Sequence, residues 1–121
     1  MRPIVIVSPH VEKWKDFGAE LGRRCSTDVI EVRSDAEAVD AAREKKPVIM
    51  IIDQDLGDMP GIELVPRLLQ INAMIHMALV SDQPEEVFHD QTEGLGILMK
   101  LSPLPDRQEA VQLCERLSGV V

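Results

Sequence analysis

The strongest constraint on the fold of this sequence is a series of short apolar runs, each followed by a polar or small residue. The runs are rich in β-branched residues and are mostly continuous, without alternation of apolar and polar positions. Such runs are typical of strands that are buried on both faces of a parallel sheet. We therefore predict five strands, over Ile4–Val7, Val29–Val32, Val48–Ile52, Met74–Val80 and Leu95–Met99, the second being the weakest.

Helical patterns separate these runs. Apolar residues recur every three or four positions over 11–21, which gives a helix after the first strand one buried face. Ser34 and Glu37 have the spacing of a capping box, in which each side chain bonds a backbone N–H at the start of a helix. The sequence therefore predicts a helix after each of the first two strands.

The second half of the chain continues the pattern. Apolar positions over 62–69 indicate a third helix, in which Pro66 is tolerated only within the opening turn. The segment 82–85 begins a short fourth helix, and Asp106 with Glu109 caps a fifth. Five strands then alternate with five helices, and right-handed crossovers make this a doubly wound α/β domain.

Length, charge and composition limit the function. A chain of 121 residues is predicted to form one domain over 1–121. The net charge of −8 argues against direct contact with nucleic acid, which needs a basic face. No apolar stretch approaches the roughly 20 residues that span a bilayer, and no signal peptide is evident, so we expect a cytoplasmic protein without membrane contact.

Several common site motifs are missing from the sequence. Cys25 and Cys114 lie far apart with no CxxC spacing, which argues against a disulfide framework and favours a reducing compartment. The histidines His10, His76 and His89 share no metal-ligand spacing. No GxGxxG or Walker sequence is present, which disfavours nucleotide binding.

Polar residues follow four of the predicted strands, and three of them suit one chemistry. In doubly wound sheets, ligands bind beyond the carboxyl ends of the strands, where Ser8, Asp53, Ser81 and Lys100 are expected. A carboxylate nucleophile, a hydroxyl and a cation are the groups that phosphoryl transfer uses. Each residue alone could simply end a strand, as polar residues usually do. Three suitable residues on three strands favour a shared site.

At these residues the sequence resembles the receiver domain of response regulators. The segment IIDQDLGDMPGIEL is similar to the segment around the phosphoacceptor of that family, with Asp53 as the acceptor and Gly61 as the glycine before the third helix. Ser81 matches the hydroxyl residue that ends the fourth strand, and Lys100 matches the lysine that ends the fifth. The resemblance covers essentially the whole chain in element order.

The resemblance implies a flavodoxin-like fold, with strand order 2-1-3-4-5 and the first and fifth helices on one face of the sheet. It also implies a role in two-component phosphorelay signal transduction and no enzymatic activity. The implied partners are a sensor histidine kinase or histidine phosphotransfer protein and a downstream signalling protein. Asp53, Ser81 and Lys100 should cluster, with Lys100 reaching the Asp53 carboxylate directly or through one water.

The metal site departs from the family pattern. Receiver domains normally place two acidic residues after the first strand to hold Mg²⁺, and here Ser8 and Pro9 stand there. Asp53 and the backbone carbonyl of Asp55 match two other family ligands. Because hard cations prefer carboxylate oxygens, we expect Mg²⁺ to bind weakly or not at all. Glu12 lies a full helical turn further on and is not expected to reach the site.

Smaller departures surround the site. Gly57 stands where the family often has proline, and Leu101 replaces the proline that commonly follows the lysine. Ile97 occupies the position of an aromatic switch residue. Asp82 adds negative charge after Ser81, where a small residue is usual.

Two other functions remain open from the sequence. One is a small phosphohydrolase of the haloacid dehalogenase type with Asp53 as nucleophile, since Asp53-Gln54-Asp55 fits the Asp-x-Asp motif of that class. Against it, the motif should follow the first core strand, and a second acidic pair should follow a later one. The other is a docking domain that keeps the fold while Asp53 is inert.

Overall fold

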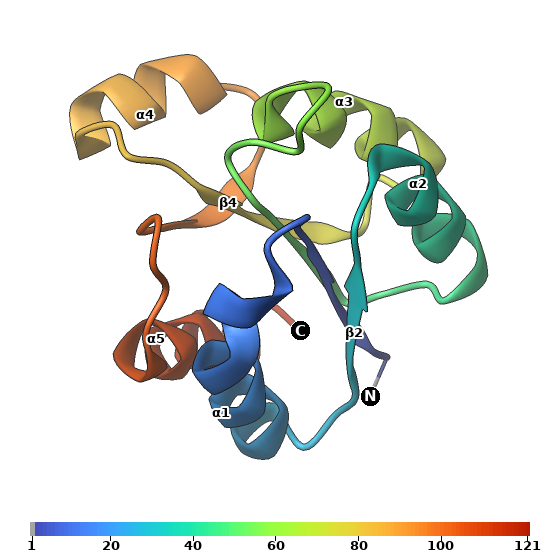
Figure 1. The fold of residues 1–121 in the computed structure, drawn as a ribbon, viewed down its shortest axis with the longest axis vertical. Helices are drawn as coiled ribbons and strands as arrows, with labels where there is room; N and C mark the ends of the chain where they lie inside the picture. The colour runs from blue at the N-terminus through green and yellow to red at the C-terminus, as the bar shows by residue number, and fades with distance from the viewer. Residues whose placement is uncertain (1) are drawn as a thin grey trace.

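A single parallel sheet forms the centre of the molecule (Figure 1). The computed structural model describes residues 2–121. Its strands are β1 (Ile4–Val7), β2 (Val29–Val32), β3 (Ile49–Ile52), β4 (His76–Val80) and β5 (Ile97–Leu101). They lie in the order β2-β1-β3-β4-β5 and pair in parallel throughout. The predicted fold class and strand order are confirmed.

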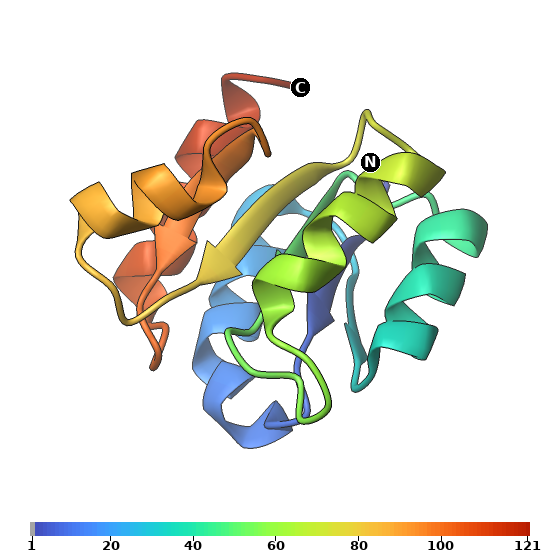
Figure 2. The same ribbon diagram turned by 90° about the horizontal axis from the view of Figure 1, so that it is seen from above.

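Helices cover both faces of the sheet, as Figures 1 and 2 show. They are the short 3₁₀ helix η1 (Val11–Trp14) and the α-helices α1 (Lys15–Cys25), α2 (Asp35–Glu44), α3 (Gly61–Ile71), α4 (Glu85–Thr92) and α5 (Arg107–Ser118). Buried residues of α1 and α5 belong to one apolar cluster, and those of α2, α3 and α4 belong to another. The first and fifth helices therefore share a face, as predicted.

The alternation of side chains along each strand divides the core between the two faces. In β1, Ile4 and Ile6 pack toward α1 and α5, whereas Val5 and Val7 pack toward α2 and α3. All four are fully buried. This two-sided burial explains why the strand reads as a continuous apolar run.

Two helices begin at the predicted caps. The Ser34 side chain accepts a hydrogen bond from the Glu37 backbone N–H at 3.1 Å and begins α2. Asp106 and Glu109 form a complete capping box at the start of α5. Each cap satisfies backbone N–H groups that have no partner within the first turn of a helix.

Several element boundaries differ from the sequence prediction. The strand β4 begins at His76, and Met74 is 75% exposed in the preceding turn. The strand β5 runs past Met99 through Lys100 to Leu101. Pro66 lies in the second turn of α3 and not in its opening turn. The proline is exposed, so its ring meets solvent and the helix continues around it.

Candidate functional site

Asp53 follows β3 at the carboxyl edge of the sheet, where its backbone is fixed on two sides. Its N–H donates to the carbonyl of Val7 at 2.9 Å. The first residue of α3, Gly61, passes so close that a Cβ on it would lie 1.9 Å from the Asp53 carbonyl oxygen. Glycine at this position therefore lets α3 start directly against the carboxyl end of β3. The sequence had singled out both residues.

The Asp53 carboxylate is buried, with 3% of the residue exposed, and both of its oxygens are bonded. Oδ2 accepts a hydrogen bond from the Ser8 hydroxyl at 2.6 Å. Oδ1 accepts from the Gln54 backbone N–H at 2.8 Å and from the Lys13 ammonium at 2.9 Å. A buried carboxylate needs such partners, because burial without them disfavours its charged form.

Lys13 supplies the positive charge at this site. Its ammonium forms an ion pair with Asp53 and also donates to the carbonyl of Pro103 at 3.0 Å. The side chain extends from η1, is 18% exposed, and lies over the Trp14 ring with the ammonium 5.5 Å from the ring centroid. Lys13 thus connects the end of β3 with the loop between β5 and α5. Sequence reasoning missed this residue, although it is the first cation after the first strand.

Lys100 was predicted to reach Asp53 directly or through one water, and the direct contact is not formed. Within the described residues, Lys100 makes no ion pair or hydrogen bond with Asp53. It lies inside β5, opposite Leu79 of β4, and lines a groove with Glu85 and His89 of α4. A register shift in the β4–β5 pairing explains the difference: Met77 pairs with Ile97 but Ala78 pairs with Met99. The extra residue moves Lys100 one position back from the edge of the sheet.

Ser81 reaches the same edge of the sheet without bonding Asp53. It is buried, and its hydroxyl accepts from the Gln83 backbone N–H at 3.1 Å. Next to it, Asp82 accepts from the Gln54 side chain at 2.8 Å. This hydrogen bond, with a smaller contribution from the charge of Lys100, holds the pKa of Asp82 below its ordinary value. The Gln54–Asp82 pair joins the residues that follow β3 and β4.

Ser102 takes the place beside Ser81 that the sequence had assigned to Lys100. The Ser81 N–H donates to the carbonyl of Leu101 at 3.0 Å, so Ser102 is the first residue beyond the paired strand. The hydroxyl and backbone N–H of Ser102 both donate to the Glu109 carboxylate, at 2.6 and 2.8 Å. At this part of the rim, the residue that follows β5 therefore bonds an acidic group of α5.

Protein donors occupy the Asp53 carboxylate oxygens that a divalent cation would need. The Ser8 hydroxyl donates its proton to Asp53, and the Lys13 ammonium lies on the other carboxylate oxygen. The Asp55 carboxylate is exposed and accepts from the Gly57 backbone N–H at 2.9 Å. Over residues 2–121, no group of three or more histidine, cysteine, aspartate or glutamate residues could hold a metal ion. A hard cation that binds Asp53 would have to displace Lys13 from it.

Solved structures of response regulators share this fold over nearly the whole chain. A two-component response regulator of the LuxR family from Aurantimonas sp. SI85-9A1 is 24% identical, with a TM-score of 0.82, covering 97% of this chain and 85% of that one. Chemotaxis protein CheY4 of Vibrio cholerae is 13% identical, with a TM-score of 0.82, covering 97% and 98%. The chain therefore has the fold of CheY-like response regulator receiver domains.

A third structure carries a modified aspartate. It is a response regulator from Burkholderia pseudomallei with a phosphorylated aspartic acid, a calcium ion and citrate. It is 16% identical, with a TM-score of 0.78, and the match covers 99% of this chain and 71% of that one. No protein-family model matches the sequence, and no curated protein matches it.

Proposed function

We propose that this chain is a receiver-type signalling domain of a two-component phosphorelay rather than an enzyme, with Asp53 as a slow phosphoacceptor. Lys13, and not a divalent cation, neutralises the acceptor carboxylate in this proposal. The domain also docks its downstream protein without phosphate, since the ion pair fixes the rim of the sheet in the unmodified state.

The observation that carries the proposal is the bonding of the Asp53 carboxylate. A phosphoryl donor brings negative charge toward this group, and a nearby cation lowers the cost of that approach. One ammonium neutralises one charge, whereas a divalent cation neutralises two and can bind phosphate oxygens at the same time. Two of the three N–H groups of the Lys13 ammonium are already bonded, to Asp53 and to the carbonyl of Pro103, so only one is left for an incoming phosphate. Both effects slow the reaction.

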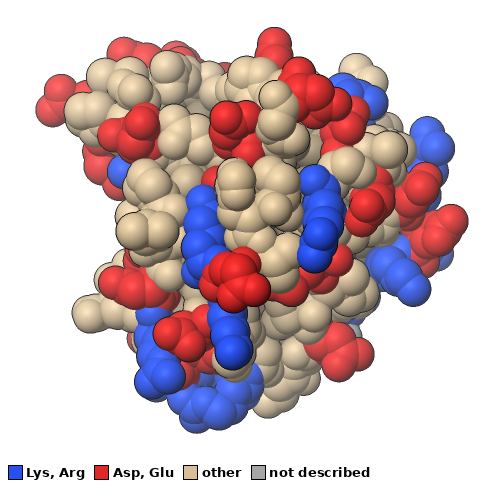
Figure 3. Space-filling model, viewed as in Figure 1, with Lys and Arg blue, Asp and Glu red and all other residues tan. Residues whose placement is uncertain are grey.

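The expected partners follow from the same chemistry. A sensor histidine kinase or histidine phosphotransfer protein would supply the phosphoryl group, and Asp53 would attack its phosphorus while the bond to the histidine nitrogen breaks. The surface offers little support for a nucleic-acid partner, because Figure 3 shows acidic side chains spread over the visible face with basic ones between them. Over residues 2–121, no helix is both long and apolar enough to cross a membrane.

The hydrolase alternative receives no support from the site. Two strand–helix units precede Asp53 in the chain, whereas the hydrolase motif should follow the first core strand. The Asp55 carboxylate, which would be the second acid of that motif, bonds to the Gly57 backbone in its own loop. None of the response regulators named above suggests hydrolysis of a phosphomonoester.

Phosphorylation is tested with a small phosphodonor. The protein is incubated with acetyl phosphate and Mg²⁺, and its intact mass is followed with time. We expect one phosphoryl group to be added slowly, with no label on Asp53→Asn. The matched control is Asp55→Asn, an exposed acid two residues away, which should label like the unmodified protein.

The other two functions predict different results for the same variants, when hydrolysis of a phosphomonoester is measured beside the intact mass. Turnover of a phosphomonoester that depends on Asp53 would establish a hydrolase and overturn the proposal. No labelling of any variant would overturn the assignment of Asp53 as phosphoacceptor and leave the docking domain with an inert Asp53. Labelling that survives Asp53→Asn would show that the acceptor is another residue.

A further inference from the structure

The two cysteines of the chain meet between α1 and α5. They are 89 residues apart in sequence, yet the sulfur of Cys25 lies 2.6 Å from the sulfur of Cys114. Both are free thiols in the structure. A disulfide bond has an S–S length of about 2.05 Å, so the sulfurs need only a small further approach to bond. The sequence spacing gave no sign of this pairing.

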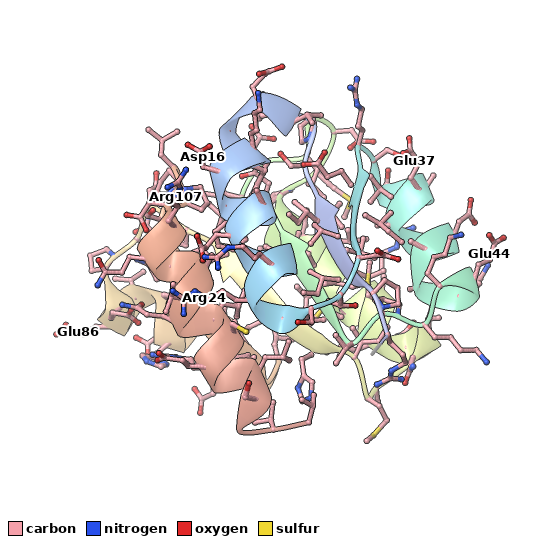
Figure 4. The ribbon with its side chains drawn as sticks, turned by 90° about the horizontal axis from the view of Figure 1, so that it is seen from below. Asp16, Arg24, Glu37, Glu44, Glu86 and Arg107 are labelled. Atoms are coloured by element: carbon pink, nitrogen blue, oxygen red, sulfur yellow. The ribbon has the colours of Figure 1, made fainter. Side chains whose placement is uncertain are left out.

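The surroundings of the two cysteines favour a disulfide bond between them over separate reactions of each thiol with an oxidant. Cys25 ends α1 and is 9% exposed, and it packs in the apolar cluster below β1 and β5. Cys114 lies in α5 and is partly exposed. Figure 4 shows the two helices side by side, with Arg24 labelled on α1 and Arg107 on α5. An oxidant from solvent therefore reaches Cys114 first, and Cys25 is already in contact with it.

We propose that Cys25 and Cys114 are a reversible modification site, at which a small-molecule disulfide such as oxidised glutathione forms an internal disulfide between α1 and α5. The sequence argued against a disulfide framework and for a reducing compartment, and in this proposal such a compartment keeps the two cysteines as thiols under ordinary conditions. The inference does not depend on phosphorylation of Asp53.

The exchange takes two steps and balances. The Cys114 thiolate attacks one sulfur of oxidised glutathione, the S–S bond breaks, and one reduced glutathione leaves. The Cys25 sulfur then loses its proton, attacks Cys114, and releases the second glutathione. Two protein thiols are oxidised, and one glutathione disulfide is reduced to two thiols. Burial raises the pKa of Cys25 to about 12, with a further contribution from Cys114, which makes Cys25 the slower, resolving thiol.

The bond would fasten one end of a helix pair whose other end is already held. Near the start of α1, Lys13 binds the carbonyl of Pro103 in the loop that leads into α5. The disulfide would join the last residue of α1 to the C-terminal half of α5. Oxidation would thus fix α5 against α1 at the end of the helix pair opposite to the Lys13–Pro103 contact.

The test uses redox buffers of reduced and oxidised glutathione. Samples are quenched with acid, alkylated with a maleimide, and measured by intact mass. We expect an oxidised monomer that lacks both alkyl groups and has lost two hydrogens, and that returns to the thiol form in excess reduced glutathione. Its thermal midpoint should rise by on the order of 10 °C, because the bond closes a long loop.

Single substitutions provide the controls. Cys25→Ser should stop at one glutathione adduct on Cys114, and Cys114→Ser should react far more slowly because Cys25 is buried. Neither variant should gain thermal stability on oxidation. Two alkylated thiols at every buffer ratio, or a disulfide-linked dimer in place of the monomer, would overturn the proposal.

Discussion

At the scale of single residues, the site is distinguished by the ion pair between Lys13 and Asp53, which the sequence did not predict. Asp53 is the residue that the sequence identified, since it follows the most buried strand and belongs to the receiver-like segment. Its cation could not be identified in the same way. The match to Lys100 depended on where β5 ends, and that boundary moved by two residues. Lys13 comes from a short 3₁₀ helix whose orientation depends on tertiary packing of Trp14 and Phe17.

The Lys13–Asp53 pair should contribute measurably to stability. We expect Lys13→Met to lower the free energy of unfolding, because it leaves the buried Asp53 carboxylate without its cation. A double-mutant cycle with Asp53→Asn should give a coupling energy of about 1–3 kcal/mol. Chemical denaturation of the four proteins measures it.

Lys100→Met is the matched control, since it removes a partly exposed lysine that does not pair with Asp53. Its coupling to Asp53→Asn should lie within about 0.5 kcal/mol of zero. A large coupling for Lys100 and none for Lys13 would contradict the assignment of the cation.

Gly61 should not tolerate a side chain. A Cβ there would meet the Asp53 carbonyl oxygen at 1.9 Å and Ile52 Cγ2 at 2.9 Å, so the start of α3 must move. We expect Gly61→Ala to destabilise the protein by about 3 kcal/mol, at the upper end for overpacking because backbone has to shift. Gly119→Ala, where the new Cβ has an ordinary contact, should cost less than about 0.5 kcal/mol. Equal stability of the two variants in urea denaturation would refute this account.

At the scale of helices and strands, the sequence correctly predicted the features that depend only on residues close together in the chain. The capping pairs Ser34–Glu37 and Asp106–Glu109 begin α2 and α5 because a cap needs only residues three apart. The end of β5 depends on its register with β4, and the irregularity near Met77 has no marker in the sequence of β5. Long-range pairing is therefore the part of the site that the sequence left undetermined.

Pro66 makes α3 less stable, but the fold tolerates it. It stands in the second turn of α3 and lacks the N–H that would bond the Ile62 carbonyl. We expect Pro66→Ala to stabilise the protein by about 1–2 kcal/mol, the gain in helix propensity being partly offset by a more flexible unfolded chain. Thermal unfolding measures the change, and Gln70→Ala, exposed on the same helix, should stay within about 0.5 kcal/mol. A less stable Pro66→Ala protein would show that the proline shapes the path of α3.

At the scale of the whole molecule, the fold was predicted mainly from the order of strands and helices along the chain. Continuous apolar runs predicted the buried parallel strands, and the resemblance to receivers supplied the order β2-β1-β3-β4-β5. From the sequence, Ser8 was expected at the carboxyl edge of the sheet and was interpreted as the replacement of an acidic metal ligand. In the structure its hydroxyl donates to Asp53, so the same substitution that removes a metal ligand adds a hydrogen bond to the carboxylate. This hydrogen bond could not be predicted from the sequence, because it depends on how close β1 and β3 lie in the folded sheet.

The central claim is that Lys13, and not Mg²⁺, is the counter-charge of Asp53. The most direct test is the rate of Asp53 labelling by acetyl phosphate, measured by intact mass with Mg²⁺ and with a chelator, for the unmodified protein and for Lys13→Met. The account predicts slow labelling that changes less than about threefold on adding Mg²⁺, and a further loss of rate in Lys13→Met. Labelling that Mg²⁺ accelerates by on the order of a hundredfold in the unmodified protein would contradict it, since that is the effect of a working metal site.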